Sequence, residues 1–229
     1  MSWFPIEFSR RVIYGVSMCN TLIAVRTCKK YTHRVEVQKA TWIPEVVAAG
    51  FEVQIFDGDR LGIPDEYRYN AMKMQAIHRW TLAHGYKRLF KVDDDTYVCA
   101  RNLKIVNDDY AGILTRANHG GYSFCPAPPQ GSVEFDYAQG GVYWMSERSM
   151  RILACASFRI SDNPLYEETC FCDRWEGQIL GRSGIFVKEL PNYFLAPDIE
   201  AKLTKDCIAV TQASIEQIEF CHERMKGMR

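Results

Sequence analysis

The hydrophobic and polar positions along the chain predict strands that alternate with helices. Residues 22–25 form an uninterrupted apolar run, with a helical pattern after it to about residue 41, and residues 51–56 alternate with a period of two. A third apolar run covers 89–92. Before it, large side chains recur at helical spacing on one face: Tyr69, Met72, Ala76, Trp80 and Ala83. This order predicts a mostly parallel α/β sheet flanked by helices.

The second half of the chain has a mixed pattern. Segments 119–121 and 126–131 are rich in glycine and proline, which predicts loops around a site. Residues 140–146 return to a strand pattern that begins with two glycines. Helices are predicted at 147–158, 174–180 and 214–225. Because the sequence contains no repeat and no linker, we expect one domain over 1–229.

Composition and charge agree with a single globular domain. The chain has 229 residues, of which 47% are hydrophobic and 24% charged. Its formal net charge is zero, so the molecule as a whole does not attract nucleic acid or anionic lipid. A local basic patch stays open, and its candidates are Arg10, Arg11, Lys29, Lys30, Arg34, Lys87 and Arg88.

Cysteine usage and the N-terminal pattern favour a reducing compartment. The nine cysteines are scattered and contain no Cys-x-x-Cys pair, which fits free thiols better than a zinc site. The longest mostly apolar stretch, 12–25, is short for a membrane span and includes polar residues. The first residues lack the order of a signal peptide. We therefore expect a cytoplasmic protein, in the host cytoplasm if it is viral, with the oligomeric state open.

Three consecutive carboxylates, Asp93, Asp94 and Asp95, directly follow the third predicted strand. Open α/β sheets bind ligands at the carboxyl ends of their strands. Three anions at that edge need a cation, and carboxylate oxygens suit Mg²⁺ or Mn²⁺, which keep positions open for diphosphate oxygens. The segment indicates a metal site for a phosphate-bearing substrate. A solvated acidic turn is the alternative.

Short motifs run through the chain in a recognisable order: Val25-Arg-Thr27, Lys39-Ala-Thr-Trp42, Lys73, Lys91-Val-Asp-Asp-Asp-Thr-Tyr-Val98, Gln139-Gly-Gly-Val-Tyr-Trp-Met-Ser146 and Asp173-Arg-Trp-Glu-Gly177. Together they resemble the β1,3-glycosyltransferases related to Fringe and the core 1 galactosyltransferases, over about residues 22–184. Separately each motif is weak, but their shared order and spacing are specific.

The resemblance implies a GT-A fold, Rossmann-like, with a DxD-type metal motif. It further implies Mn²⁺ or Mg²⁺, a nucleotide-sugar donor, usually UDP-linked, and inversion at the anomeric carbon. The donor-binding half would cover about 20–110 and the acceptor and catalytic half about 111–229. The lack of an anchor and of disulfides suggests a bacterial, phage or viral relative of the family.

The resemblance also assigns roles to residues. Asp95 would bind the metal together with Asp93, and Asp173 would be the catalytic base. Donor-binding candidates are Arg26, Thr27, Asp57, Lys73, Asp93, Asp94, Gly140 and Gly141. Simpler explanations stay open: a helix N-cap for Asp173, a plain turn for the two glycines, an Asp-Gly turn for Asp57, and solvent exposure for Arg26 and Lys73.

Two separate acidic sites, the aspartate triplet and Asp173, suit the chemistry of such a transfer independently of the resemblance. Inverting transfer to a hydroxyl needs a carboxylate that accepts the acceptor's proton and a separate Lewis acid that holds the diphosphate. The base must stay ionised in a partly enclosed pocket, so we expect a modestly raised pKa for Asp173.

The chain departs from the family pattern at the metal. Cys172 replaces the acid that usually precedes the catalytic aspartate, and the family's metal-binding histidine is missing. His222 is the only histidine after Asp173, and Gln212 lies where the family histidine would be. Either residue is a candidate third ligand, and water is the alternative, which leaves strict metal dependence open.

The acceptor is open, and so are other functions. Tyr143, Trp144 and Trp175 are candidates for stacking on an acceptor, with core packing as the alternative. Glycan, glycolipid, protein and a modified DNA base are all possible acceptors. A non-catalytic nucleotide-sugar or glycan-binding module of the same fold is a second hypothesis. Phosphoryl transfer is disfavoured because no Gly-x-x-x-x-Gly-Lys loop occurs.

Overall fold

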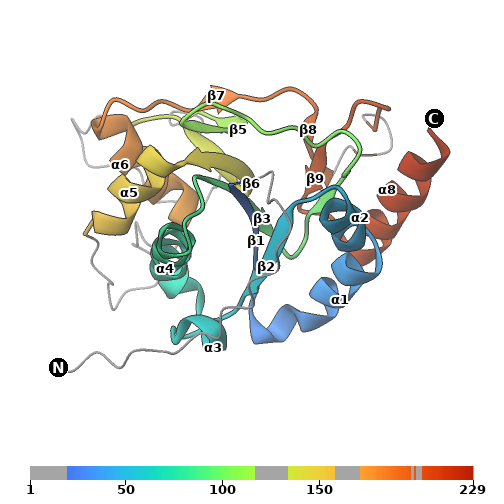
Figure 1. Cartoon of the computed structure of the whole chain (residues 1–229), viewed down its shortest axis with the longest axis horizontal. Coiled ribbons are helices and arrows are strands. Elements are labelled where there is room, and N and C mark those ends of the chain that lie inside the picture. Colours follow the sequence, from blue (N-terminus) through green and yellow to red (C-terminus); the bar gives the residue numbers. More distant parts are fainter. Residues whose placement is uncertain (1–19, 117–133, 158–170, 197–198, 200–202, 229) are drawn as a thin grey trace.

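A computed structural model describes residues 20–116, 134–157, 171–196, 199 and 203–228. Their strands form a six-stranded sheet in the order β2-β1-β3-β6-β5-β7 and a three-stranded sheet in the order β4-β9-β8 (Figure 1). The strands of the large sheet are β1 Thr21–Arg26, β2 Glu52–Phe56, β3 Arg88–Asp93, β5 Tyr110–Thr115, β6 Tyr137–Ser146 and β7 Lys188–Glu189. Those of the small sheet are β4 Tyr97–Val98, β8 Tyr193–Leu195 and β9 Ala209–Thr211.

All strands of the large sheet except one point the same way. β1 pairs in parallel with β2 and with β3. β6 runs antiparallel between β3 and β5, and β7 is parallel to β5. The mostly parallel α/β sheet that the sequence predicts is confirmed.

Helices cover both faces of this sheet because both faces of its central strands are apolar. The described helices are α1 Thr32–Ala40, α2 Ile43–Ala48, α3 Gly58–Leu61, α4 Asn70–Ala83, α5 Glu147–Cys155, α6 Cys172–Arg182 and α8 Ile215–Gly227, with 3₁₀ turns η1 Lys29–Tyr31 and η2 Tyr67–Tyr69. In Figure 1, α4, α5 and α6 lie on one side of the sheet and α1, α2 and α8 on the other.

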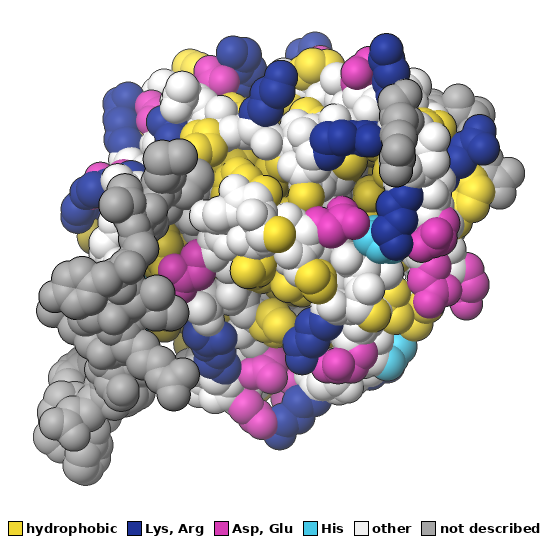
Figure 2. Space-filling model, turned by 45° about the vertical axis from the view of Figure 1, so that its right-hand side comes forward, with side chains coloured by type: hydrophobic (Ala, Val, Ile, Leu, Met, Phe, Trp, Pro, Cys, Tyr) yellow, Lys and Arg dark blue, Asp and Glu magenta, His cyan; other side chains and the backbone are white. Residues whose placement is uncertain are grey.

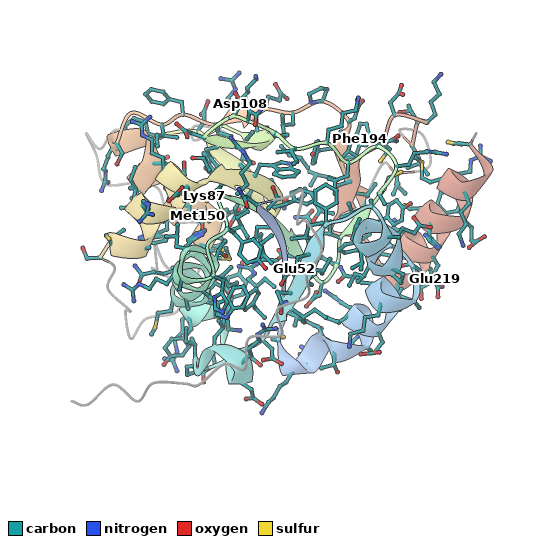
Figure 3. All side chains as sticks on the ribbon, in the orientation of Figure 1. Glu52, Lys87, Asp108, Met150, Phe194 and Glu219 are labelled. Carbon is teal, nitrogen blue, oxygen red and sulfur yellow. The ribbon has the colours of Figure 1, made fainter. Side chains whose placement is uncertain are left out.

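Alternate residues of β3 feed two separate hydrophobic cores. Leu89 packs with buried residues of α4, α5 and α6, among them Met150 of α5, which Figure 3 labels. Phe90 and Val92 pack with α2, α8 and the small sheet. Since successive side chains of a strand point to opposite faces, the same alternation decides on which side each polar residue at the strand end emerges.

The sequence pattern misses several elements. The helix that the spacing of large side chains from Tyr69 to Ala83 predicts is α4, which begins at Asn70, with α3 and η2 before it. β5 lies where the pattern becomes irregular, and its last three residues are only partly buried, so they carry no clean apolar signal. The loops predicted at 119–121 and 126–131 lie outside the described residues.

Two further findings concern the expected compartment. Among the described helices, none combines the length and the apolar character that a bilayer crossing requires. All six cysteines that the structure describes are free thiols.

Candidate functional site

A cavity of about 780 Å³ opens at the carboxyl ends of β1 and β3. Its walls include the end of β1 and the segment after it, the aspartates at and after the end of β3, the first half of β6 and the start of α6. Most of the residues predicted from the sequence line it: Arg26, Thr27, Lys73, Asp93, Asp94, Asp95, Gly140, Gly141, Asp173 and Gln212. Positions far apart in the sequence therefore share one space.

Asp93 is neutralised by two cations of the protein. The Arg26 guanidinium donates from Nε to Oδ1 at 2.9 Å and from Nη2 to Oδ2 at 3.0 Å. Lys91, two residues earlier on β3, contacts Oδ1 at 2.6 Å, and its side chain is completely buried. Of the two predicted metal ligands, Asp93 already has its charge balanced by side chains.

Asp94 ties β1 to α1 on the other side of the strand. The Thr27 hydroxyl donates to its Oδ2 at 2.7 Å, and Arg34 Nη1 donates to its Oδ1 at 3.2 Å. Burial raises the pKa of Asp94, while these two hydrogen bonds favour its ionised form. Its oxygens face the protein, so it holds the wall of the cavity in place.

Asp95 has an oxygen that nothing in the described part of the chain binds. Its Oδ1 is buried without a hydrogen-bond partner there, and Oδ2 lies 3.8 Å from Arg34 Nη1. Burial, and then the charges of Asp93 and Asp94, raise the pKa of Asp95 to about 6. A buried carboxylate oxygen without a partner is costly. Asp95 is thus the carboxylate of the triplet best suited to hold a ligand.

The loop before α8 brings Gln212 next to this carboxylate. The Ala213 N–H donates to the Asp95 carbonyl at 2.9 Å. Gln212 has a φ of 59°, a left-handed conformation that costs free energy in a residue other than glycine and is often kept at functional sites. The position inferred from the missing family histidine therefore does lie in the cavity.

Asp173 lies at the second position of α6 and closes the opposite wall. The N-cap of α6 is Phe171, so the simpler explanation of Asp173 as a helix N-cap is wrong. Its Oδ2 accepts a hydrogen bond from the Gly140 N–H at 3.0 Å and its Oδ1 accepts one from the Arg174 N–H at 2.9 Å. The side chain is 8% exposed, and this burial raises its pKa, against the opposing effects of the Arg174 N–H, Lys91 and Arg26.

The two glycines of β6 are needed for contacts within the protein. A Cβ on Gly140 would lie 3.0 Å from Asp173 Oδ2, and a Cβ on Gly141 would overlap Thr211 Oγ1. Lys91 Nζ donates to the Gly140 carbonyl, so this residue links the buried ammonium to Asp173 through its own backbone. A plain turn does not account for these contacts, and because both glycines also line the cavity, their part in binding the donor stays a prediction.

Close packing of α6 on β6 sets the position of Asp173. Gly177 and Gly181 lie one turn apart on the buried face of α6, where a Cβ would collide with Tyr137 and Phe135. On the same face, Glu176 Oε1 lies 2.7 Å from His78 Nε2 of α4, and both side chains are fully buried. Helix α6 therefore docks against both the sheet and α4.

Lys73 lines the cavity and is paired with an aspartate that the sequence did not single out. Its side chain is 2% exposed, and Nζ lies 2.5 Å from Asp65 Oδ1. Asp65 also accepts hydrogen bonds from the Lys29 and Gly58 N–H groups. Burial would raise the pKa of Asp65, but these hydrogen bonds and Lys73 lower it overall. Lys73 is thus a positioned donor rather than a solvated side chain.

Asp57 lies outside the cavity lining that the structure describes. Its side chain accepts a hydrogen bond from the Arg60 N–H at 2.8 Å and caps α3. Asp65 lines the cavity instead, and no local pattern marks it, because its contacts come from three segments that meet only in the fold.

The aromatic residues proposed for the acceptor belong to the core. Tyr143 and Trp144 are completely buried and Trp175 is 4% exposed. Trp144 stacks on Phe90 with ring centroids 4.4 Å apart and donates from Nε1 to the Tyr193 hydroxyl at 2.9 Å. None of the three lines the cavity. The structure supports the core alternative for all of them.

His222 is also outside the cavity lining. It is 6% exposed, and its ring lies 6.2 Å from that of Tyr97 in the packing of α8. Between the two candidates for a third metal ligand, the structure places Gln212, not His222, beside the aspartates.

Sequence reasoning gave no role at the aspartates to Lys91, which lies outside the cavity lining, or to Arg34, which lines it, although a signal existed for Lys91. Lys91 is a fully buried cation in an otherwise apolar strand, a rare combination that indicates a partner or a function. Arg34 contacts Asp94 and Asp95 from α1, and nothing in its helix marks it.

The basic patch considered from the sequence is divided by the fold. Lys29 and Lys30 follow the carboxyl end of β1, whereas Lys87 and Arg88 lie at the amino end of β3, which is parallel to β1. A strand of six residues separates the two ends by about 20 Å. Arg10 and Arg11 lie outside the described residues. On the face that Figure 2 presents, basic and acidic side chains are interspersed.

The donor set around Asp95 fits a divalent cation held mainly by water and substrate. The described residues contain no group of three or more His, Cys, Asp or Glu side chains placed to hold a metal. Mg²⁺ commonly uses only one or two carboxylates, together with waters and substrate phosphates. The unpartnered Asp95 Oδ1 suits that mode, and Gln212 lines the same cavity.

Comparison with solved structures shows a fold similar to that of a known transferase. A crystal structure of a glycosyltransferase involved in the glycosylation of the major capsid of PBCV-1 matches with a TM-score of 0.53 and 14% identity, over 91% of this chain and 99% of that chain. No protein-family model and no curated protein matches the sequence. The chain shares its fold with this glycosyltransferase, and its relation to the Fringe and core 1 enzymes stays a prediction.

Proposed function

We propose that this protein is a metal-dependent, inverting glycosyltransferase that moves a sugar from a nucleoside diphosphate to a hydroxyl group. UDP is the expected nucleoside diphosphate. One observation carries the proposal: a single cavity at the sheet edge holds both an acidic cluster with an unpartnered oxygen on Asp95 and a separate buried carboxylate, Asp173. The two halves of such a reaction need these two groups in one space.

The charge of the cavity supports a dianionic donor accompanied by a divalent cation. Five basic and five acidic side chains line it: Arg26, Lys29, Lys30, Arg34 and Lys73 against Asp65, Asp93, Asp94, Asp95 and Asp173. With Lys91, which contacts Asp93 from outside the lining, the formal charge is +1. The two negative charges of a nucleoside diphosphate sugar would make the site negative, and a divalent cation removes this excess, which favours binding of donor and metal together.

In the proposed reaction the protein binds and orients the donor and the acceptor, and it moves one proton. Asp173 accepts the proton of the acceptor hydroxyl, whose oxygen bonds to the anomeric carbon while the bond from that carbon to the diphosphate breaks. Lys91 and the Gly140 N–H hold Asp173 and its neighbours in place. Lys73, fixed by Asp65, presents an ammonium to the donor. A bound Mg²⁺ or Mn²⁺, held by Asp95 and assisted by Gln212, would neutralise charge on the departing diphosphate.

A screen of nucleotide sugars tests the proposal directly. We expect release of free nucleoside diphosphate from one UDP-sugar in the presence of Mg²⁺ or Mn²⁺ and a strong decrease after chelation by EDTA. Release of the nucleoside diphosphate is measured with and without a mixture of glycosides as acceptors. Tight binding of UDP without turnover of any donor would instead assign a non-catalytic binding module, and intact donors without UDP binding would contradict the proposal.

The charge of Asp95 gives a prediction for the stability of the metal-free protein. Because its folded pKa is raised to about 6 from an ordinary value of 3.8, ionised Asp95 opposes folding. This loss of stability is absent near pH 3 to 4, grows as pH rises, and is complete above about pH 6. We therefore expect Asp95→Asn to melt at a higher temperature than wild type above pH 6 and at the same temperature near pH 4.

Added metal should reverse the order of the melting temperatures of wild type and Asp95→Asn above pH 6. Mg²⁺ or Mn²⁺ at about 100 times its Kd stabilises a protein by about 2.7 kcal/mol, which is about 5–10 °C in Tm for a chain of this size. Wild type should show this shift and Asp95→Asn should not. Asp108→Asn, at the amino edge of the sheet (Figure 3), is the control that keeps the shift. Equal shifts in all three proteins would place the metal elsewhere.

A further inference from the structure

An aromatic pair stands at the mouth of the cavity, beside the residues that surround Asp173. Tyr67 of η2 and Phe171, the N-cap of α6, both line the cavity, and their rings meet edge to face with centroids 6.0 Å apart. Tyr67 is 61% exposed, the second most exposed large hydrophobic side chain in the described part of the chain. An exposed ring held against a second ring at a cavity is a ready contact surface.

The position of this pair relates it to the acceptor side of the reaction. Phe171 precedes Asp173 by two residues, and the Trp175 N–H donates to its carbonyl at 3.0 Å, which fixes Phe171 at the first turn of α6. Tyr67 lies close enough to Asp173 for the charge of that carboxylate to act on its phenol, and both residues line the cavity. A group resting on these rings would therefore reach the carboxylate that accepts the proton.

We infer that Tyr67 and Phe171 form an acceptor subsite that binds the apolar face of a pyranose ring, so that the acceptor is a carbohydrate; the inference rests on the proposed function. The C–H groups on one face of a pyranose complement the negative face of an aromatic ring. The hydroxyls at the edge of the sugar find acceptors in the carboxylates nearby, and one of them meets Asp173.

The surroundings of the pair disfavour a nucleic-acid acceptor. Asp65 and Glu66 immediately precede Tyr67, and Asp173 lines the same cavity. Arg68, the cation that follows, contacts Glu66 Oε2 at 2.6 Å. The cavity lining carries as many acidic as basic side chains, whereas nucleic-acid sites present a run of basic groups to phosphate.

The test measures binding of simple glycosides while the donor side is filled. Methyl β-D-galactopyranoside and methyl α-D-mannopyranoside are titrated into the protein with saturating UDP and Mg²⁺, and binding is followed by saturation-transfer NMR. We expect signal on the ring C–H protons of one glycoside. Tyr67→Ala should weaken its binding about 10-fold, and Tyr67→Phe should retain it within about 2-fold, because the ring face and not the hydroxyl makes the contact.

Controls separate this inference from the proposed function. Phe186→Ala removes a 67% exposed ring outside the cavity lining and should change nothing. UDP affinity, measured by calorimetry, should be equal in wild type and all variants. A 10-fold loss of UDP affinity in Tyr67→Ala would assign the ring to the donor base and overturn the inference.

Two other outcomes would overturn it as well. Wild type that binds UDP but neither glycoside would leave the proposed function standing without a carbohydrate subsite here. Short single-stranded DNA that binds wild type and not Tyr67→Ala would assign the ring to a nucleobase. Failure of wild type to bind UDP would count against the proposed function, while a glycoside signal that depends on Tyr67 would still support the subsite.

Discussion

Asp173→Asn is expected to lower kcat for sugar transfer by about 10² to 10⁴-fold, the usual contribution of a general base. The amide cannot accept the proton of the acceptor hydroxyl, although its oxygen can still receive one of the two backbone hydrogen bonds that the carboxylate receives. UDP affinity should stay the same, because Asp173 acts on the acceptor. Turnover of the UDP-sugar and calorimetry with UDP measure the two quantities separately.

The pH dependence gives a second readout of the same change. Because burial raises the pKa of Asp173, wild-type kcat should begin to fall on acidification at a pH above the ordinary range of an aspartate. The residual activity of the variant should lack this decline. Asp57→Asn makes the same chemical change on the cap of α3 and should leave kcat unaltered. If Asp173→Asn matches Asp57→Asn, the assignment of the base is wrong.

Trp144→Ala is expected to reduce the free energy of unfolding by about 3–5 kcal/mol, as removal of a buried tryptophan does. The indole is completely buried, stacks on Phe90 and binds the Tyr193 hydroxyl, so the variant loses packing and leaves a buried hydroxyl without its partner. Urea unfolding followed by circular dichroism measures the change.

An exposed ring provides the comparison for this variant. Phe220 of α8 is 41% exposed, and Phe220→Ala should change the free energy of unfolding by about 0.5 kcal/mol or less. The acceptor KM of the folded fraction of Trp144→Ala should equal that of wild type. A raised KM with unchanged stability would return Trp144 to the acceptor site and contradict its place in the core.

The parts of the site that follow from strand order and direction were predictable from the sequence. A carboxylate triplet at the end of an apolar strand must emerge at the sheet edge, and β1 and β3 being parallel puts Arg26 beside Asp93. The position of Asp173 in the site could be predicted only from the family resemblance. It depends on how α6 docks on the sheet through Gly177 and Gly181, and the sequence does not reveal this contact.

What the sequence missed depends on contacts between distant segments. All ten residues of β6 are buried, so alternation could not distinguish a core aromatic from one that faces a ligand, and Trp144 was a candidate for both. The aromatic ring that does face the cavity, Tyr67, lies in a 3₁₀ turn without any periodic pattern. Pro64-Asp65 looks like a helix start, yet the Asp65 carboxylate binds Lys29, Gly58 and Lys73 in the fold, and α4 begins later.

Strand β6 carries Gly140, which receives Asp173, and four residues later Trp144, which fills the core. A slip of one residue in its pairing would turn both to the wrong side of the sheet at once. In the proposed mechanism, activity and correct assembly of the core therefore depend on the same register of this strand. Chains in which β6 pairs in the wrong register should have no activity, not reduced activity. Preparations of destabilised core variants should therefore contain a smaller fraction of active molecules, and each active molecule should turn over at the wild-type rate.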